Sequence, residues 1–220
     1  MKHAERFLPI FLFLSLLTVY GMTLAPGLTW ANRGADGGDL ITAAATGGVP
    51  HPTGYPVYLL LARVFQYLPI GSLAFRTNLL SALAAAGASL LVYGLVSRAS
   101  QNPLAGLISA YAFGLSPLLW SQAVITEVYA LQAFFIALIF YLSIFPLSPN
   151  EKKSDLALGL AFGLALGNHV TTILLLPVIL FSTVSRRESR WQFDVCSLLR
   201  RLAWLGAGLL TYLSLPLRAA

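Results

Sequence analysis

A short segment after the first apolar run holds acidic and imidazole side chains among many glycines and prolines. It is residues 34–56, GADGGDLITAAATGGVPHPTGYP, and it contains Asp36, Asp39 and His51. A carboxylate at the outer side of a helical bundle suits a general base that removes a proton from a hydroxyl group. Asp39 could instead cap the helix predicted by LITAAA, and His51 could only stiffen a turn between two prolines. Asp36 has no comparable structural role, so it is the preferred base.

Two more ionisable residues stand at apolar stretches. Glu127 lies just inside an apolar run, in the sequence TEVY, and His169 interrupts another run at GNH. A charge at membrane depth costs ~2.5–3.5 kcal/mol on insertion scales, so such residues usually mark a site or a pair. The structural alternatives are an interfacial helix start for Glu127 and a hydrogen-bonded packing histidine for His169.

Arginines near these acids suggest a phosphate group, because the guanidinium fork matches phosphate oxygens. Arg33 and Arg76 are the candidates, although Arg76 could merely anchor a helix end. Acid plus arginine at a membrane surface fits transfer from a lipid phosphate carrier to a hydroxyl acceptor. No Walker loop or Rossmann fingerprint indicates a soluble nucleotide donor. No metal cage is evident, but Asp36, Asp39 and a histidine could hold a hard divalent cation.

The composition is that of a membrane protein. Of 220 residues, 57% are hydrophobic and 10% are charged, whereas soluble domains carry roughly 25% charged residues. The net charge of +6 does not indicate nucleic acid, because the basic residues lie in short runs between apolar stretches. The single cysteine, Cys196, excludes an internal disulfide and a cysteine-built metal site.

The apolar runs predict an all-α fold, a polytopic membrane helical bundle in a single domain over residues 1–220. The first run could be a signal peptide, but its length and poor cleavage site favour an uncleaved helix. Residues 55–68 are too short to span and contain Arg63 and Gln66, so we expect a helix at the interface. The predicted spans are residues 7–24, 75–96, 103–119, 125–145, a hairpin at 156–184, and 202–217.

The hairpin follows from the charges that flank it. Residues 156–184 are long for one untilted span, and basic residues stand at both ends. Because basic loops stay cytoplasmic, we expect both ends on that side and a break at Gly167-Asn168-His169. With the N-terminus inside, the cytoplasmic basic residues are Lys2, Arg6, Arg98, Lys152, Lys153, Arg186, Arg187, Arg190, Arg200 and Arg201. Only Arg33, Arg63, Arg76 and Arg218 then fall outside, on the face that carries Asp36, Asp39, His51, Glu127 and His169.

The acids on the cytoplasmic side all stand near Lys or Arg. We expect them to be solvated surface charges: Glu5, Glu151, Asp155, Glu188 and Asp194.

An ordered set of motifs resembles one family over essentially the whole chain. The motifs are D36-GGD, H51-PTGYP, R76-TNLLSAL, E127-VYAL, G167-NH and L215-PLRA. They are similar to a family of C-type (GT-C) membrane glycosyltransferases, long filed as a domain of unknown function, that includes an animal transmembrane protein O-mannosyltransferase.

The resemblance implies transfer of a sugar, a mannose-like hexose, from a polyprenyl-phosphate donor to a hydroxyl acceptor on a protein or glycan. The reaction would occur on the non-cytoplasmic face with inversion, in a GT-C-like fold whose first external loop carries short interfacial helices and the catalytic Asp36 or Asp39. The resemblance further implies substrate-binding roles for His51, Tyr55, Arg76, Glu127, His169 and Arg218.

Two departures from the family pattern matter. The acidic motif more often reads Asp-Ser-Gly-Glu after a Trp, and here the shorter Asp39 stands in the Glu position, which favours Asp36 as the base. Family members also run beyond Arg218, so the chain could be a fragment. The alternatives are a transporter or flippase of a lipid-linked substrate, and an inactive truncated scaffold.

Overall fold

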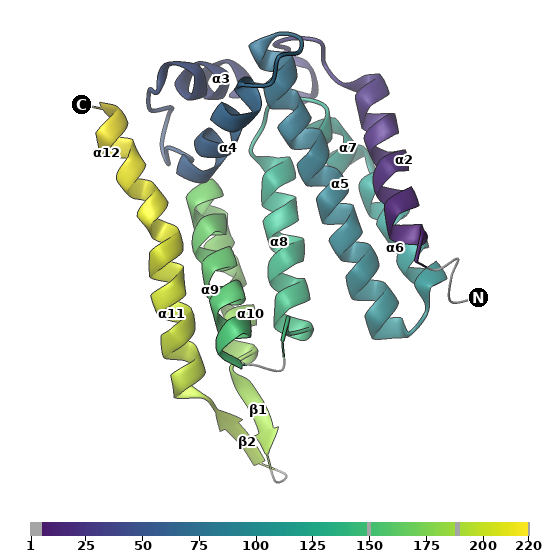
Figure 1. Ribbon diagram of the computed structural model, residues 1–220, viewed down its shortest axis with the longest axis vertical. Coiled ribbons are helices and arrows are strands. Elements are labelled where there is room, and N and C mark those ends of the chain that lie inside the picture. Colours follow the sequence, from purple (N-terminus) through teal and green to yellow (C-terminus); the bar gives the residue numbers. More distant parts are fainter. Residues whose placement is uncertain (1–5, 149–150, 188–189, 220) are drawn as a thin grey trace.

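The fold is a layer of long helices with short helices across one end. A computed structural model describes residues 6–148, 151–187 and 190–219 (Figure 1). Lys2, Glu5 and Glu188, whose charges enter the topology argument, lie outside the described residues. The architecture is mainly helical, as expected. The two-stranded antiparallel pair β1 (Val184–Arg187) and β2 (Arg190–Phe193) is an exception that the all-α prediction missed.

The first half of the chain supplies α2 (Leu8–Thr23), α5 (Leu73–Ser100), α6 (Pro103–Gly114), α7 (Pro117–Ala123) and α8 (Tyr129–Ile144). The expected span at 103–119 is two helices bent by 66°. The bend follows from sequence, because Pro117 cannot continue the hydrogen-bond ladder and Ser116 caps α7 through Leu119 N. The expected span at 125–145 begins later, at Tyr129, so Glu127 lies in the loop before α8.

Length and composition identify fewer spanning helices than the sequence analysis predicts. Within the described residues, Leu73–Ser100 is long and apolar enough to cross a membrane, and the bent pair α6–α7 becomes a second candidate if it counts as one span. Other apolar helices are shorter, among them α2 and α8. The multi-pass topology therefore stays a prediction.

The second half forms a layer of α9 (Glu151–Asn168), η2 (Val170–Leu175), α10 (Leu176–Phe181), α11 (Val195–Leu209), η3 (Leu210–Leu213) and α12 (Ser214–Ala219). Helix α9 ends at Asn168, at the GNH sequence, and the chain turns back through η2, which packs against α9, into α10 (Figure 1). Arg201 of α11 bonds both Asp155 near the start of α9 and Ser182 after α10. These contacts join the two ends of segment 156–184, whose crossing of a membrane stays a prediction.

Glycines allow α9 and α11 to approach closely. A Cβ on Gly159 or Gly163 would collide with the backbone of Arg201 or Leu205, and one on Gly208 would lie 2.7 Å from Leu164 N. Such close backbone approach through small residues is typical of helix pairs in membranes.

The segment between α2 and α5 folds into α3 (Gly37–Thr46) and α4 (Pro56–Gln66), which lie across the end of the long helices (Figure 1). Arg63 and Gln66, the polar residues within the apolar sequence of α4, form hydrogen bonds to the backbone of α3. Arg63 Nη1 donates to the carbonyls of Ala44 and Ala45, and Gln66 Nε2 donates to Ile41 O at 3.1 Å. Arg63 thereby satisfies carbonyls in the last turn of α3 that would otherwise lack partners, and both side chains hold α3 in place.

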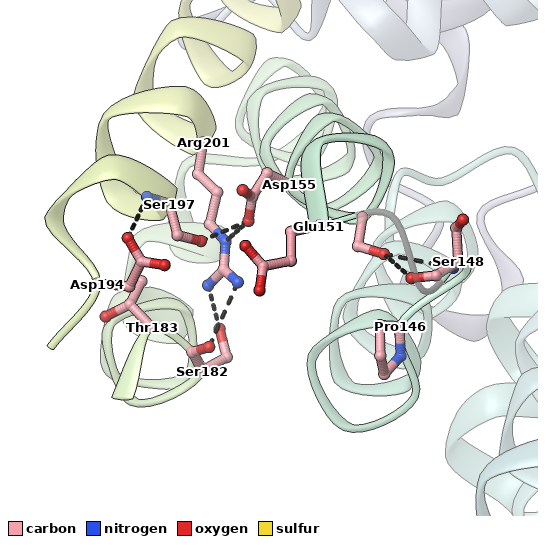
Figure 2. A pocket seen from close by; sticks show the side chains of 10 residues that line it. Pro146, Ser148, Glu151, Asp155, Ser182, Thr183, Asp194, Ser197 and Arg201 are labelled. Atoms are coloured by element: carbon pink, nitrogen blue, oxygen red, sulfur yellow. Dashed lines mark hydrogen bonds and ion pairs between the residues drawn. The ribbon is translucent and has the colours of Figure 1, made fainter. Parts of the chain in front are cut away.

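At the opposite end, the structure corrects the expectation that Asp155 is a solvated charge. Asp155 is 2% exposed and forms ion pairs with Arg200 and Arg201 at 2.7 and 2.8 Å. Ser197 Oγ donates to it as well, and the group lines a cavity of about 260 Å³ (Figure 2). Proximity in sequence to basic residues could not distinguish a solvated carboxylate from this buried ion pair.

Candidate active site

Asp39 and His51 form the best-defined contact of the acidic segment. Asp39 Oδ2 lies 2.9 Å from His51 N and 2.7 Å from His51 Nδ1. Burial by itself would raise the pKa of Asp39, but these hydrogen bonds outweigh it and hold the pKa below its usual value. Asp39 is therefore an ionised hydrogen-bond acceptor, and its Oδ2 accepts both hydrogen bonds from His51.

The far nitrogen of His51 faces two other groups. Nε2 lies 3.0 Å from the hydroxyl of Tyr55 and 3.6 Å from Asp36 Oδ2. Burial, and next the charge of Asp36, raises the pKa of Tyr55, so its hydroxyl stays protonated and can donate to Nε2. The structure thus brings together Asp36, Asp39, His51 and Tyr55, all of which the sequence analysis selected.

Asp36 differs from Asp39 in having a freer carboxylate. It occupies the N-cap position of α3, yet its side chain makes no capping hydrogen bond there, and it is 39% exposed. Its backbone N–H donates to Glu127 Oε1 at 3.2 Å. The carboxylate of Asp36 is therefore held by its main chain and remains accessible.

Glu127 is the buried acid of the site. It is 1% exposed, and within the described part of the chain its second oxygen, Oε2, is buried without a hydrogen-bond partner. Burial raises the pKa of Glu127 to about 7, and the charge of Asp36 acts in the same direction. A glutamic acid that is protonated near neutral pH can carry a proton on Oε2 while Oε1 accepts from Asp36.

Asn78 of α5 fixes the loop that carries Glu127. Its Nδ2 donates to Ala25 O at 2.8 Å, and its Oδ1 accepts from Thr126 Oγ1 at 2.6 Å. Ala25 N also donates to Val124 O at 2.9 Å. These bonds join the segment after α2, the start of α5 and the α7–α8 loop, and so position Glu127 next to the backbone of Asp36.

His169 joins the site through aromatic contacts. Its ring stacks on Tyr55 with centroids 6.1 Å apart and lies 5.8 Å from the ring of Tyr129. The adjacent Asn168 is fully buried and donates to Val128 O and Gln132 Oε1. The break after α9 thus carries His169 to the same end of the bundle as the carboxylates.

The arginines selected from the sequence take different places. Arg76 donates to the carbonyls of Ile70, Gln66 and Gly71, at 2.6, 2.8 and 2.9 Å. These contacts agree with the alternative in which Arg76 anchors a helix end. They use N–H groups of the guanidinium that was expected to bind substrate.

Arg218 differs from Arg76, because its Nη1 is buried and has no hydrogen-bond partner among the residues that the structure describes. It stands one turn after Leu215, whose Cδ1 would be 2.6 Å from a Cβ on Gly54 in the His51–Tyr55 segment. Helix α12 therefore packs against that segment, and Gly54, with φ of 85°, leaves room for it.

A cavity of about 800 Å³ opens beside the cluster. Its lining combines apolar side chains of α6, α7 and α8 with polar groups of the loop after α2, including Arg33, Gln122, Phe113, Leu119 and Tyr129. Tyr129 belongs to both this cavity and the aromatic contact with His169. The arrangement offers a largely apolar cavity that contains Arg33 and borders the cluster through Tyr129.

The cluster does not fit a resident metal ion as it is arranged. Over residues 6–148, 151–187 and 190–219 no group of three or more His, Cys, Asp or Glu side chains is placed to hold one. Nδ1 of His51 is directed at Asp39 rather than at a shared centre.

Sequence reasoning missed three residues of the site: Tyr129, Asn78 and Asn168. Asn78 and Asn168 are buried amides, at 2% and 0% exposure, inside apolar helices. A single amide side chain in an apolar run could have indicated both residues, because a buried amide must form hydrogen bonds. Tyr129 gave no separate signal, since aromatic residues are common at helix starts near an interface.

Comparison with known proteins agrees with the motif order. Residues 36–192 match the family described as "Protein O-mannosyl-transferase TMEM260 N-terminal domain". The protein O-mannosyl-transferase TMEM260 of Mus musculus is 35% identical over 213 residues, covering 93% of this chain and 29% of the mouse protein. The protein O-mannosyl-transferase tmem260 of Dictyostelium discoideum is 29% identical over 206 residues, covering 86% of this chain and 25% of that protein. No solved structure matches.

The chain thus spans less than a third of the length of these two relatives. The family match includes Asp36, Asp39, His51 and His169, the residues that meet at the end of the bundle. This chain belongs to the protein O-mannosyl-transferase TMEM260 family, in the part that forms its N-terminal domain.

Proposed function

We propose that this chain carries the base of a membrane GT-C glycosyltransferase that moves a mannose-like hexose from a polyprenyl-phosphate carrier to a hydroxyl of a protein or glycan acceptor. The relatives are named protein O-mannosyl-transferases, which supports the reaction type. The reaction takes place with inversion on the non-cytoplasmic face of a multi-pass membrane domain.

One observation carries the assignment of the base. Oδ2 of Asp39 accepts two hydrogen bonds from His51, whereas the carboxylate of Asp36 makes no hydrogen bond within the described residues and lies 3.6 Å from His51 Nε2. Asp36 is the carboxylate that can receive the proton of an acceptor hydroxyl. Asp39 then stabilises the site without contacting the acceptor.

The surroundings suit a donor with a phosphate and an apolar tail. The cavity of about 800 Å³ offers apolar walls and Arg33 at the loop after α2, and Arg218 keeps a buried nitrogen without a partner. A guanidinium with a free donor suits an anionic oxygen. These residues are the proposed contacts to the donor phosphate.

The test is mannosyl transfer from a polyprenyl-phosphate mannose to an acceptor peptide by the purified membrane protein. Asp36→Asn should lower transfer by about 100-fold or more, because general-base catalysis contributes ~10²–10⁴ in rate. Asp194→Asn is a matched control at the opposite end of the bundle and should transfer at the wild-type rate. Undiminished transfer by Asp36→Asn would reject the base, and flux of the lipid-linked sugar across proteoliposomes without a glycosidic product would indicate a transporter.

A further inference from the structure

We infer that Asp39 and His51 form a proton relay behind Asp36. In this relay His51 Nε2 accepts the proton that Asp36 has taken from the acceptor hydroxyl, and Asp39 is the positioning residue that orients the imidazole. The inference rests on the proposed function, since it concerns the fate of the proton after sugar transfer. It assigns a role to His51 other than contact with substrate.

The orientation of the imidazole carries the argument. Asp39 Oδ2 lies 2.7 Å from Nδ1 and also accepts from the backbone N–H of His51. An ionised carboxylate can only accept, so Nδ1 carries the proton and Nε2 of the neutral ring keeps its lone pair as an acceptor. That lone pair is on the side of the ring that faces Asp36 Oδ2, 3.6 Å away.

The hydroxyl of Tyr55 can form a hydrogen bond with either protonation state of His51. Its hydroxyl lies 3.0 Å from Nε2 and can donate to the neutral ring. A hydroxyl also accepts, so the same group can turn and accept from Nε2–H after the ring is protonated. Tyr55 is 8% exposed and its ring contacts the rings of His51 and His169, so its position is fixed while its hydroxyl hydrogen rotates.

The step balances without a further reagent. The acceptor O–H bond breaks and its oxygen forms the new bond to the anomeric carbon, while the bond from that carbon to the phosphate oxygen breaks and its electron pair leaves with the lipid phosphate. The proton resides first on Asp36, then on Nε2 of His51, and then passes to solvent, to which His51 is 38% exposed. Nothing is oxidised or reduced.

The groups that face His51 are Asp36 and Asp39 at the start of α3, Tyr55 before α4, and Glu127 in the α7–α8 loop. The carboxylates of Asp36 and Asp39 lie 3.6 and 2.7 Å from the two ring nitrogens, on opposite sides of the proton path that the relay needs.

Chemical rescue tests the relay. His51→Ala should lower kcat about 10- to 100-fold, with less change in the donor KM, because only proton transfer is affected. Added imidazole should then restore kcat several-fold, and the restoration should follow the concentration of neutral imidazole. His169→Ala is the matched control: it removes a half-buried histidine of the same cluster, and imidazole should not restore its activity.

Each other outcome counts against the relay. A His51→Ala protein that keeps wild-type kcat, or whose loss imidazole leaves unchanged, would overturn it. If His51→Ala does not fold, His51→Gln with the same imidazole series replaces it and is judged by the same criterion. Asp39→Asn should lower kcat and should not respond to imidazole, because the ring is present but misoriented. Absence of transfer by the wild-type protein itself would reject the proposed function and the relay together.

Discussion

The backbone N–H of Asp36 donates a hydrogen bond of 3.2 Å to Oε1 of Glu127, although 91 positions separate the two residues. This bond joins the start of α3 to the loop between α7 and α8. Glu127 is buried, so the position of Asp36 depends on a group whose charge costs free energy in the fold.

Glu127→Gln tests that cost through pH. Because the folded pKa of about 7 is raised from 4.5, the folded protein binds more protons between these values, and its stability falls as pH rises through them. Glutamine keeps the acceptor oxygen and removes the ionisation. At pH 8 the free energy of unfolding of the variant should exceed that of the wild-type protein by roughly 2–3 kcal/mol. Chemical denaturation in detergent measures both values. Identical pH profiles for the two proteins would contradict the assignment.

Arg76→Gln should separate anchoring from substrate binding. The variant loses the bonds to three main-chain carbonyls and should lose on the order of 1–2 kcal/mol of stability, with an unchanged donor KM. Arg33→Gln, in the loop beside the larger cavity, should do the reverse and raise the donor KM several-fold at wild-type stability. Thermal denaturation and initial rates with varied donor distinguish the two arginines. An increase in the donor KM of Arg76→Gln would show instead that Arg76 binds the donor.

Asn78→Ala should disturb the site from within the bundle. The change leaves Ala25 O and Thr126 Oγ1 without their partner and should cost about 1–3 kcal/mol in the free energy of unfolding. Since the Thr126 contact positions Glu127, kcat should fall as well. Ser89→Ala is a control in the same helix, whose hydroxyl donates to the carbonyl of its own turn, at Ala85; it should preserve kcat. Equal kcat for both variants would show that Asn78 does not position the loop.

Asp155→Asn should destabilise the α9–α11 pair strongly. Removing one partner of a buried ion pair costs about 3–5 kcal/mol because it leaves the other charges uncompensated. Asp194→Asn is the matched control, since asparagine still caps α11, and it should change stability little.

Acid should act on the wild-type protein through the same residue. Burial alone would raise the pKa of Asp155, but hydrogen bonds from Ser197, Arg201 and Arg200 outweigh it and lower the pKa. The stabilisation is therefore present above the unfolded value near 4 and is lost as pH falls through the lowered folded value. A wild-type protein whose unfolding shows no added acid sensitivity over Asp155→Asn would contradict this account.

Gly163→Ala should separate α9 from α11. Its Cβ would collide with the backbone of Leu205 and lie 3.0 Å from Gly208 Cα, so the helices must move apart, at about 1–3 kcal/mol. Gly206→Ala meets nothing within 4 Å and should be neutral or slightly stabilising, because alanine favours the helix. Denaturation midpoints compare the two variants. Equal midpoints would show that the helix contact tolerates a methyl group.

Local signals predicted much of the helical order. Apolar runs, Pro117 and the GNH sequence indicate where helices lie and end, because these features act through neighbouring residues. Charge counting selected Asp36, Asp39, His51 and Glu127 as a group for the same reason, since ionisable residues are rare beside apolar runs. The strands β1 and β2 were missed because each has only four residues, and an alternating pattern is present in β2 but not in β1.

Tertiary contacts alone decided which role each residue has. Asp155 and Asp194 both stand near arginines in the sequence, yet Asp155 is buried between two guanidinium groups and Asp194 caps a helix. Arg76 and Arg218 carry the same charge. Main-chain carbonyls accept hydrogen bonds from Arg76, whereas Nη1 of Arg218 has no hydrogen-bond partner among the described residues.

The sequence by itself determined the family, the helical class and the set of ionisable residues from which a site could be built. Only the tertiary structure decided that Asp39 binds His51 and that Asp36 stays accessible. The physical reason is that residue type sets what a group can do, whereas burial, distance and competing partners set what it does, and these arise from segments far apart in the chain.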